Sequence, residues 1–141
     1  MRDLNPRAWS IDSECWCTRV DYDGYKEEWS GIVPVLAPDN RSKRIGEVED
    51  TNIIVEFPTG LKDKNGEMVY EGDIVLDCYD RDDAFIVEWD KDTASFILTD
   101  TEHILNVSFD IFYPDKYLEV IGNIHENKEL LEMRNNGRFS L

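Results

Sequence analysis

Apolar residues recur at every second position along much of this chain, and this alternation constrains the fold more than any other feature. The period is clearest in segment 85–90, where apolar side chains stand at Phe85, Val87 and Trp89, separated by Ile86, Glu88 and Asp90. A two-residue period places such side chains on one face of a half-buried strand. We therefore expect mainly β structure, arranged as an antiparallel barrel or sandwich rather than a parallel α/β sheet.

The same period predicts six strands and two of the turns between them. The strands are expected at 52–57, 70–76, 85–90, 96–98, 105–111 and 118–124. The turn-forming residues Asp90–Ala94 join two of them into a hairpin. Asn65-Gly66 is a strong signal for a type I′ turn, because both residues tolerate positive φ. It is expected to join segments 52–57 and 70–76.

The two ends of the chain follow the alternation less closely. Before Thr51 we expect short strands and a mobile loop over Pro38–Arg44. Near the other end, Asn127 is a good N-cap and Gly137 stands where a helix would stop, which predicts one short C-terminal helix. The expected organisation is a β-rich N-terminal segment or small subdomain over 1–58 and a second part over 59–141.

The charge balance argues against two classes of function. The chain of 141 residues holds 31 Asp and Glu against 15 Lys and Arg, for a net charge of −16. Nucleic acids and anionic membranes are bound largely through basic residues, so direct binding to either is not expected. No apolar run approaches the roughly 20 residues that span a bilayer, and nothing at the start resembles an export signal. A cytoplasmic location follows as the expectation.

The sequence contains no pattern typical of a metal site, a cofactor site or a catalytic nucleophile. A calcium loop starting at Asp63 fails, because Met68 and Ile74 stand where glycine and a bidentate glutamate belong. Cys15 and Cys17 are spaced too closely for a structural zinc site and are interpreted as reduced, packing thiols. No nucleophile motif surrounds the third cysteine. We therefore expect no catalytic residue, no metal, no cofactor and no enzymatic activity.

Segment 71–102 is the most acidic part of the chain, with 11 acids against Arg81 and Lys91. A dense negative face can mimic nucleic-acid phosphates in the groove of a DNA-binding protein, or attract a basic partner. It can also simply keep a small β domain soluble.

The chain contains two long motifs, Thr59–Val75, read as TGLKDKNGEMVYEGDIV, and Val120–Leu131, read as VIGNIHENKELL. Together with a partial third match at Arg7-Ala8-Trp9, these motifs resemble the YopX protein family of phages and prophages. The resemblance implies an SH3-like antiparallel β-barrel in the C-terminal part and a phage or prophage origin. It implies no activity, since the family is functionally uncharacterised.

Within these motifs, four glycines are expected to meet backbone requirements, either positive φ or close approach of another group: Gly60, Gly66, Gly72 and Gly122. Several polar residues are candidates for an interaction surface: Asp63, Asn65, Tyr70, Glu71, Asp73, Asp80, Asp82, Asp83 and Asn123. For some of these the alternative is turn stabilisation, which Asp and Asn provide without any ligand.

These observations favour a non-enzymatic phage or prophage accessory protein that binds an unknown host or phage protein or assembles with itself as a homo-oligomer. The alternative is an acidic nucleic-acid mimic that inhibits a DNA-binding protein. A third hypothesis, a small hydrolase that uses a pair of carboxylates, has no specific motif behind it.

Overall fold

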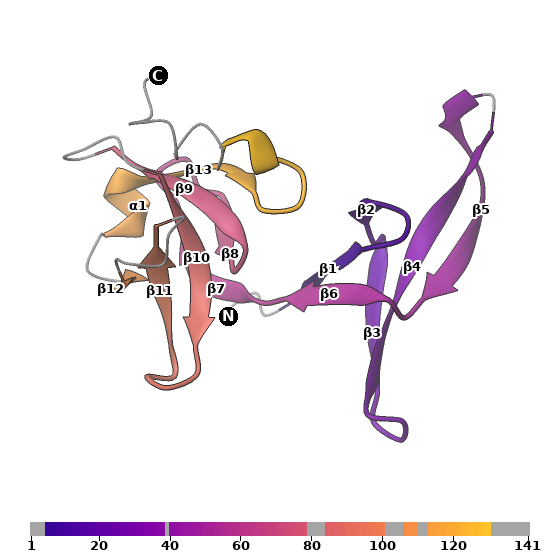
Figure 1. Cartoon of the computed structure of the whole chain (residues 1–141), viewed down its shortest axis with the longest axis horizontal. Helices are drawn as coiled ribbons and strands as arrows, with labels where there is room; N and C mark the ends of the chain where they lie inside the picture. The colour runs from indigo at the N-terminus through magenta and orange to yellow at the C-terminus, as the bar shows by residue number, and fades with distance from the viewer. Residues whose placement is uncertain (1–4, 39, 79–83, 101–105, 110–112, 131–141) are drawn as a thin grey trace. The chain divides into compact units, whose positions relative to one another are not determined.

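The computed structural model describes residues 5–38, 40–78, 84–100, 106–109 and 113–130. Over these residues the protein is mainly β, as the alternation predicts. The chain divides into two compact units, one spanning Asn5–Phe57 and the other beginning at Pro58 (Figure 1). The boundary expected from the sequence lies one residue later, after residue 58.

The N-terminal unit consists of two antiparallel three-stranded sheets. The first has the order β2-β1-β6, formed by Cys15–Trp16, Arg7–Ser10 and Ile53–Glu56. The second has the order β3-β4-β5, formed by Arg19–Asp23, Glu28–Ala37 and Asn40–Asp50. The prediction of a mobile loop over Pro38–Arg44 is therefore wrong, because β5 begins at Asn40 and pairs with β4.

The core of this unit is thin. Its buried apolar side chains among the described residues are Ala8, Val33 and Ala37, none larger than valine. Gly31 is also buried, and a Cβ there would lie 2.4 Å from the Cys17 Sγ atom. Strand β4 thus passes close to Cys17 at Gly31, and the larger apolar side chains of the unit remain partly or fully exposed.

The second unit contains a two-stranded and a five-stranded antiparallel sheet. The two-stranded sheet pairs β7, Pro58–Lys62, with β8, Met68–Tyr70. The five-stranded sheet has the order β12-β11-β10-β9-β13. Its strands, in chain order, are β9 Asp73–Asp77, β10 Ala84–Asp90, β11 Ser95–Thr99, β12 Asn106–Ser108 and β13 Leu118–Asn123.

Strand β9 organises this unit because both of its faces are buried. On one face Val75 packs in a cluster with Val69, Val87, Leu98 and others, and on the opposite face Ile74 and Leu76 pack together. A strand covered on both faces carries a continuous apolar run. The neighbouring strand β10 shows the same effect, since Ile86, expected among the outward residues, is buried and Trp89 is half exposed.

The Asn65-Gly66 turn is present, but it joins different strands in a different conformation. It connects β7 to β8, whereas segment 52–57 forms β6 and pairs with β1. Gly66 has a φ of 84°, but Asn65 is not among the described residues with positive φ, so the type I′ expectation is wrong. Gly66 N–H donates to the Asp63 carbonyl and Asp63 N–H to the Glu67 carbonyl, which is the pattern of a type I turn followed by a left-handed glycine.

Two short helical segments accompany the strands. Helix α1, Pro114–Tyr117, was not expected from the sequence; proline at its first turn suits a helix start. Residues 128–130 are helical directly after Asn127, where the C-terminal helix is predicted, and the rest of that prediction lies outside the described residues. Among the strands described, no sheet closes on itself as a barrel.

Candidate protein-binding surface

Asp63, the first of the predicted surface residues, is buried and holds three backbone donors. Only 3% of it is exposed. Its Oδ1 atom accepts hydrogen bonds from the N–H groups of Asn65 and Glu67, both at 2.9 Å. Its Oδ2 atom accepts one from Val120 of β13, also at 2.9 Å. The carboxylate therefore fixes the β7–β8 turn against the outer edge of β13, where Lys64 N–H also donates to the Leu118 carbonyl.

Asp73 and Asn123 are buried partners in the register of β9 and β13. The Asp73 Oδ2 atom accepts a hydrogen bond of 2.8 Å from Tyr70 N–H. The Asn123 Oδ1 atom accepts from the N–H groups of His125 and Glu126, at 3.0 and 2.9 Å. Both side chains thus stabilise the turns that follow β8 and β13.

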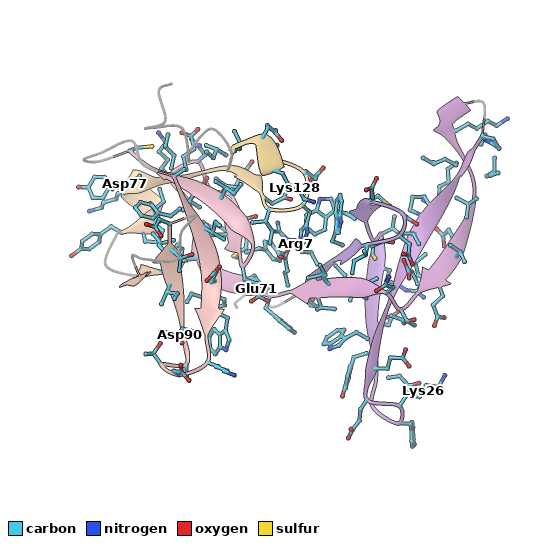
Figure 2. The ribbon with its side chains drawn as sticks, viewed as in Figure 1. Arg7, Lys26, Glu71, Asp77, Asp90 and Lys128 are labelled. Carbon is cyan, nitrogen blue, oxygen red and sulfur yellow. The ribbon has the colours of Figure 1, made fainter. Side chains whose placement is uncertain are left out.

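Three more of the predicted residues are described, and these are less buried. Asn65 is exposed and its amide nitrogen lies 3.5 Å from Glu119 Oε1. Tyr70 and Glu71 are half-buried, and Figure 2 places Glu71 beside strand β8. Asp80, Asp82 and Asp83 lie outside the described residues. The structure thus gathers the two turns along β13, with Asp63 near one end of the strand and Asp73 near the other.

The four glycines of the two motifs meet the backbone requirements predicted for them. Gly60, Gly66 and Gly72 have φ values of 86°, 84° and 86°. Gly122 is required by close approach instead, because a Cβ there would lie 2.5 Å from Asn127 Oδ1. That oxygen accepts a hydrogen bond from Asn123 N–H, so the Asn127 side chain is held in place and cannot move aside freely.

The cysteines are free thiols, and two of them have perturbed acidity. Burial, and secondarily the Asp50 carboxylate, raises the pKa of the Cys15 and Cys17 thiols. A raised pKa lowers the thiolate fraction and with it nucleophilicity and metal affinity. Among the described residues, no three His, Cys, Asp or Glu side chains lie close enough together to hold a metal ion.

A small polar cluster lies beside the third cysteine. The Cys78 thiol and, secondarily, the Glu119 carboxylate raise the pKa of the exposed Lys64 ammonium. Lys64 Nζ lies 3.5 Å from Glu119 Oε2, and Cys78 Sγ lies 3.9 Å from the same oxygen. The acid and base form an ion pair at a partly exposed site, where such pairs contribute little to stability.

The Arg7-Ala8-Trp9 segment packs the first sheet of the N-terminal unit together. Arg7 Nε donates to Glu56 Oε1 at 3.1 Å, and its guanidinium lies 4.5 Å from the centre of the Trp16 ring. Trp9 meets the same Trp16 ring edge to face, with centres 5.1 Å apart. Ala8 between them is fully buried. This segment therefore serves the packing of its own sheet.

Three aromatic rings form a chain of contacts on the N-terminal unit. Tyr22 of β3 and Trp29 of β4 are register partners with ring centres 4.9 Å apart. Trp29 in turn lies 5.8 Å from Phe57, which follows β6. Tyr22 and Phe57 are exposed and Trp29 is half-buried. We call these three residues the aromatic ladder.

The aromatic ladder was missed by sequence reasoning because its members are distant along the chain and only strand pairing brings them together. Tyrosine and tryptophan are enriched at the energetic centres of protein interfaces, since they bury much apolar area with few rotatable bonds. An open hollow of about 550 Å³ lies around the neighbouring β3–β4 turn, lined by residues that include Asp21, Tyr22, Tyr25 and Glu49. Figure 2 shows Lys26 at the tip of this hairpin.

Comparison with known proteins establishes the family. A profile described as YopX protein matches residues 6–132. The chain belongs to the YopX protein family. This YopX-family chain is also similar to the crystal structure of protein EF1440 from Enterococcus faecalis, at 24% identity and a TM-score of 0.50, over 93% of this chain and 99% of that one. That likeness concerns the fold alone.

Two further findings concern curated relatives and membrane-spanning helices. No curated protein matches the chain. None of the helices in the described parts of the chain is long and apolar enough to cross a membrane.

Proposed function

We propose that this YopX-family protein is a non-enzymatic module that binds a protein partner through the aromatic ladder. The supporting observation is the contact chain Tyr22–Trp29–Phe57, whose outer two rings stay exposed on a unit with a thin core. Tyrosine and tryptophan are enriched at the energetic centres of protein interfaces, and contiguous exposed apolar groups mark contact sites. Binding would cover apolar area that the unit's own small residues leave open to solvent.

The test is affinity capture from a lysate of the organism that carries the gene, comparing three versions of the full chain. Tyr22→Ser with Phe57→Ser removes the two exposed rings of the ladder. Tyr25→Ser with Ile54→Ser is the matched control, since it removes two exposed apolar side chains of the same unit. We expect the ladder variant to lose at least about tenfold of the captured partner while the control keeps it. Equal capture by both variants would contradict the proposal.

The alternative function is an acidic nucleic-acid mimic that occupies the groove of a DNA-binding protein. Its supporting observation is the charge of segment 71–102, with 11 acids against two bases. A partner bound in this way should be displaced by duplex DNA and by added salt, because both compete for the same basic groove. A captured partner that duplex DNA leaves in place excludes this alternative.

We also infer that the second unit is an SH3-like barrel in a phage or prophage accessory protein that works in the bacterial cytoplasm. The family resemblance supports the origin, and the sheet geometry supports the barrel. Strands β9, β10 and β11 form a meander, β13 returns to pair with β9, and a register shift between Val120 and Gly122 bends that last strand. An experimental structure of the full chain tests the barrel: the β7–β8 hairpin should close the five-stranded sheet, and an open sheet would contradict it.

A further inference from the structure

We propose that the outer part of the β4–β5 hairpin docks onto the turn of the β10–β11 hairpin in a second copy of this chain. The donor surface, here called the arm, consists of Pro34–Ala37 of β4 and Lys43–Gly46 of β5. The acceptor consists of Trp89 and Phe96 with the acids Glu88, Asp90 and Asp92. This contact uses none of the three rings of the aromatic ladder, so it adds a surface to the proposed binding module.

The arm is a two-stranded ribbon that leaves its larger apolar side chains exposed. Strand β3 pairs with β4 only as far as Ile32, and the hairpin continues beyond it (Figure 1). On the arm, Val35, Leu36 and Ile45 are 38%, 42% and 57% exposed. An isolated two-stranded hairpin is at best marginally stable in water, so a long arm gains stability when another surface covers it.

The backbone of the arm favours docking by side chains rather than by added strands. The Ile32 carbonyl accepts a hydrogen bond from Thr18 N–H, so it points to the β3 side. Alternate residues of a strand direct their backbone groups to the same side, which places Pro34 on the side of β4 that has no further strand partner. Proline has no N–H to donate there, and it blocks pairing with another strand. The register shifts on either side of Leu36 also interrupt a regular edge.

The charge of the arm separates it from the rest of the molecule. Lys43 and Arg44 of the arm end the sequence Arg-Ser-Lys-Arg at 41–44, and no other four consecutive residues of the chain include three basic residues. Arg44 forms an ion pair with Glu47 within β5. The whole chain nevertheless carries −16, so the matching surface for a basic arm is present on every copy of the protein.

The turn of the β10–β11 hairpin offers the complementary chemistry. Trp89 is 49% exposed and packs edge to face on Phe96, with ring centres 5.0 Å apart. Three acids lie within five residues, at Glu88, Asp90 and Asp92, against the single base Lys91. Figure 2 shows Asp90 near the end of this hairpin. Aromatic faces attract Lys and Arg, carboxylates pair with them, and the tryptophan ring can cover aliphatic side chains of the arm.

Reciprocal exchange of arms is the simplest assembly that uses this contact. When each of two chains donates one arm and receives one, a two-fold axis relates the two identical contacts and both acceptors are occupied. Each chain contributes the eight residues of its arm and the five of its acceptor, fewer than the roughly 20 to 30 residues per side of an ordinary stable interface, so the dimer is expected to be weak and sensitive to salt. The aliphatic side chains of the arm favour a protein occupant over nucleic-acid phosphates.

The test is sedimentation of the purified full chain and of two charge-reversed variants. We expect wild type to dimerise at roughly 0.05 M salt and to dissociate at least about tenfold more readily at roughly 0.5 M, where screening is strong. Lys43→Glu with Arg44→Glu reverses the arm, and Glu88→Lys with Asp92→Lys reverses the acceptor. Each variant alone should be monomeric, because like charges then face each other in both contacts.

Mixing the two variants gives the decisive result. In a mixed pair the acidic arm meets the basic acceptor and the basic arm meets the acidic acceptor, so a heterodimer should form at low salt. Lys26→Glu, at the exposed tip of the β3–β4 hairpin, is the control and should dimerise as wild type does. A monomeric wild type, a dimer that survives both reversals, or a mixture that stays monomeric would overturn the proposal.

The same samples separate this proposal from the proposed function. Tyr22→Ser with Phe57→Ser should leave the dimer intact. If that variant dissociates the dimer while the charge reversals do not, the ladder is the self-association surface and the arm is not. If wild type is monomeric yet captures a partner in a ladder-dependent way, the arm proposal is overturned and the proposed function stands.

Discussion

Replacing Asp63 should destabilise the second unit far more than replacing an aspartate in another turn. The carboxylate accepts three backbone hydrogen bonds and is 3% exposed. In Asp63→Ala, the Asn65 and Glu67 N–H groups lie at an exposed turn and regain water, which costs about 1 kcal/mol each. The Val120 N–H lies on a half-buried strand and loses a charged acceptor, which costs about 1.5 to 3 kcal/mol. The sum is about 3 to 5 kcal/mol, a large part of the roughly 5 to 15 kcal/mol that stabilises a typical domain.

Two further variants sharpen this prediction. Asp63→Asn keeps an oxygen for the turn but turns an NH₂ group toward Val120 N–H, so we expect a loss of about 2 to 3 kcal/mol. Asp90→Ala is the matched control in the same unit, since Asp90 accepts from Asp92 N–H and the Thr93 hydroxyl within a single solvent-exposed turn. Its loss should stay near 1 kcal/mol or less.

The assay is urea unfolding followed by circular dichroism, with hydrogen exchange of peptides from β13 to locate the effect. Asp63→Ala should speed exchange at Leu118–Asn123 while leaving the N-terminal unit unchanged. If Asp63→Ala lowered the free energy of unfolding by less than about 1 kcal/mol, or by as much as Asp90→Ala, the result would refute the argument that the buried Asp63 carboxylate stabilises the contact of the β7–β8 turn with β13.

Two other predictions follow from close packing and from thiol acidity. Gly122→Ala places a Cβ 2.5 Å from the Asn127 Oδ1 atom and should lower the free energy of unfolding by about 1 to 3 kcal/mol. The control is Gly24→Ala, whose Cβ would have no atom within 4 Å and should change the free energy of unfolding little. Equal effects of the two variants in calorimetry would contradict this prediction. Because their pKa is raised, the Cys15 and Cys17 thiols should react with iodoacetamide more slowly than glutathione does at neutral pH. Their reaction rate should approach that of glutathione only as the pH rises through their pKa. Peptide mass spectrometry measures the labelling, and faster labelling than that of glutathione would refute the prediction.

A local pattern in the sequence predicts the β10–β11 hairpin correctly. This hairpin combines two signals within a short stretch of sequence: apolar residues at every second position, and a turn rich in Asp and Thr between them. The partner of β6 is not predictable in the same way, because β1 lies more than 40 positions earlier and pairing depends on the whole fold. The type I′ turn predicted at Asn65-Gly66 was wrong for a related reason. The Asp63 side chain binds the turn's own N–H groups and selects a type I turn over type I′.

The candidate surface was harder to predict than the strands. Polar residues in the family motifs were candidates for an interaction surface. Three of them, Asp63, Asp73 and Asn123, are buried, and their side-chain oxygens accept hydrogen bonds from backbone N–H groups. The aromatic ladder has no motif, and it exists only because the β3–β4 register sets Tyr22 opposite Trp29. Ring proximity of this kind requires a structure.

The doubly buried strand β9 has a consequence for synthesis of the chain on the ribosome. Its neighbour β10 emerges within a few residues, but its other neighbour, β13, pairs through contacts such as Val75 with Val120 and is translated much later. Until then the nascent sheet lacks its outer strand, and the packing of Ile74 and Leu76 against Ile121 and Ile124 cannot form. The unit is thus expected to fold only after translation passes residue 124. A stalled or truncated chain would expose the apolar face of an incomplete sheet and would be prone to aggregate.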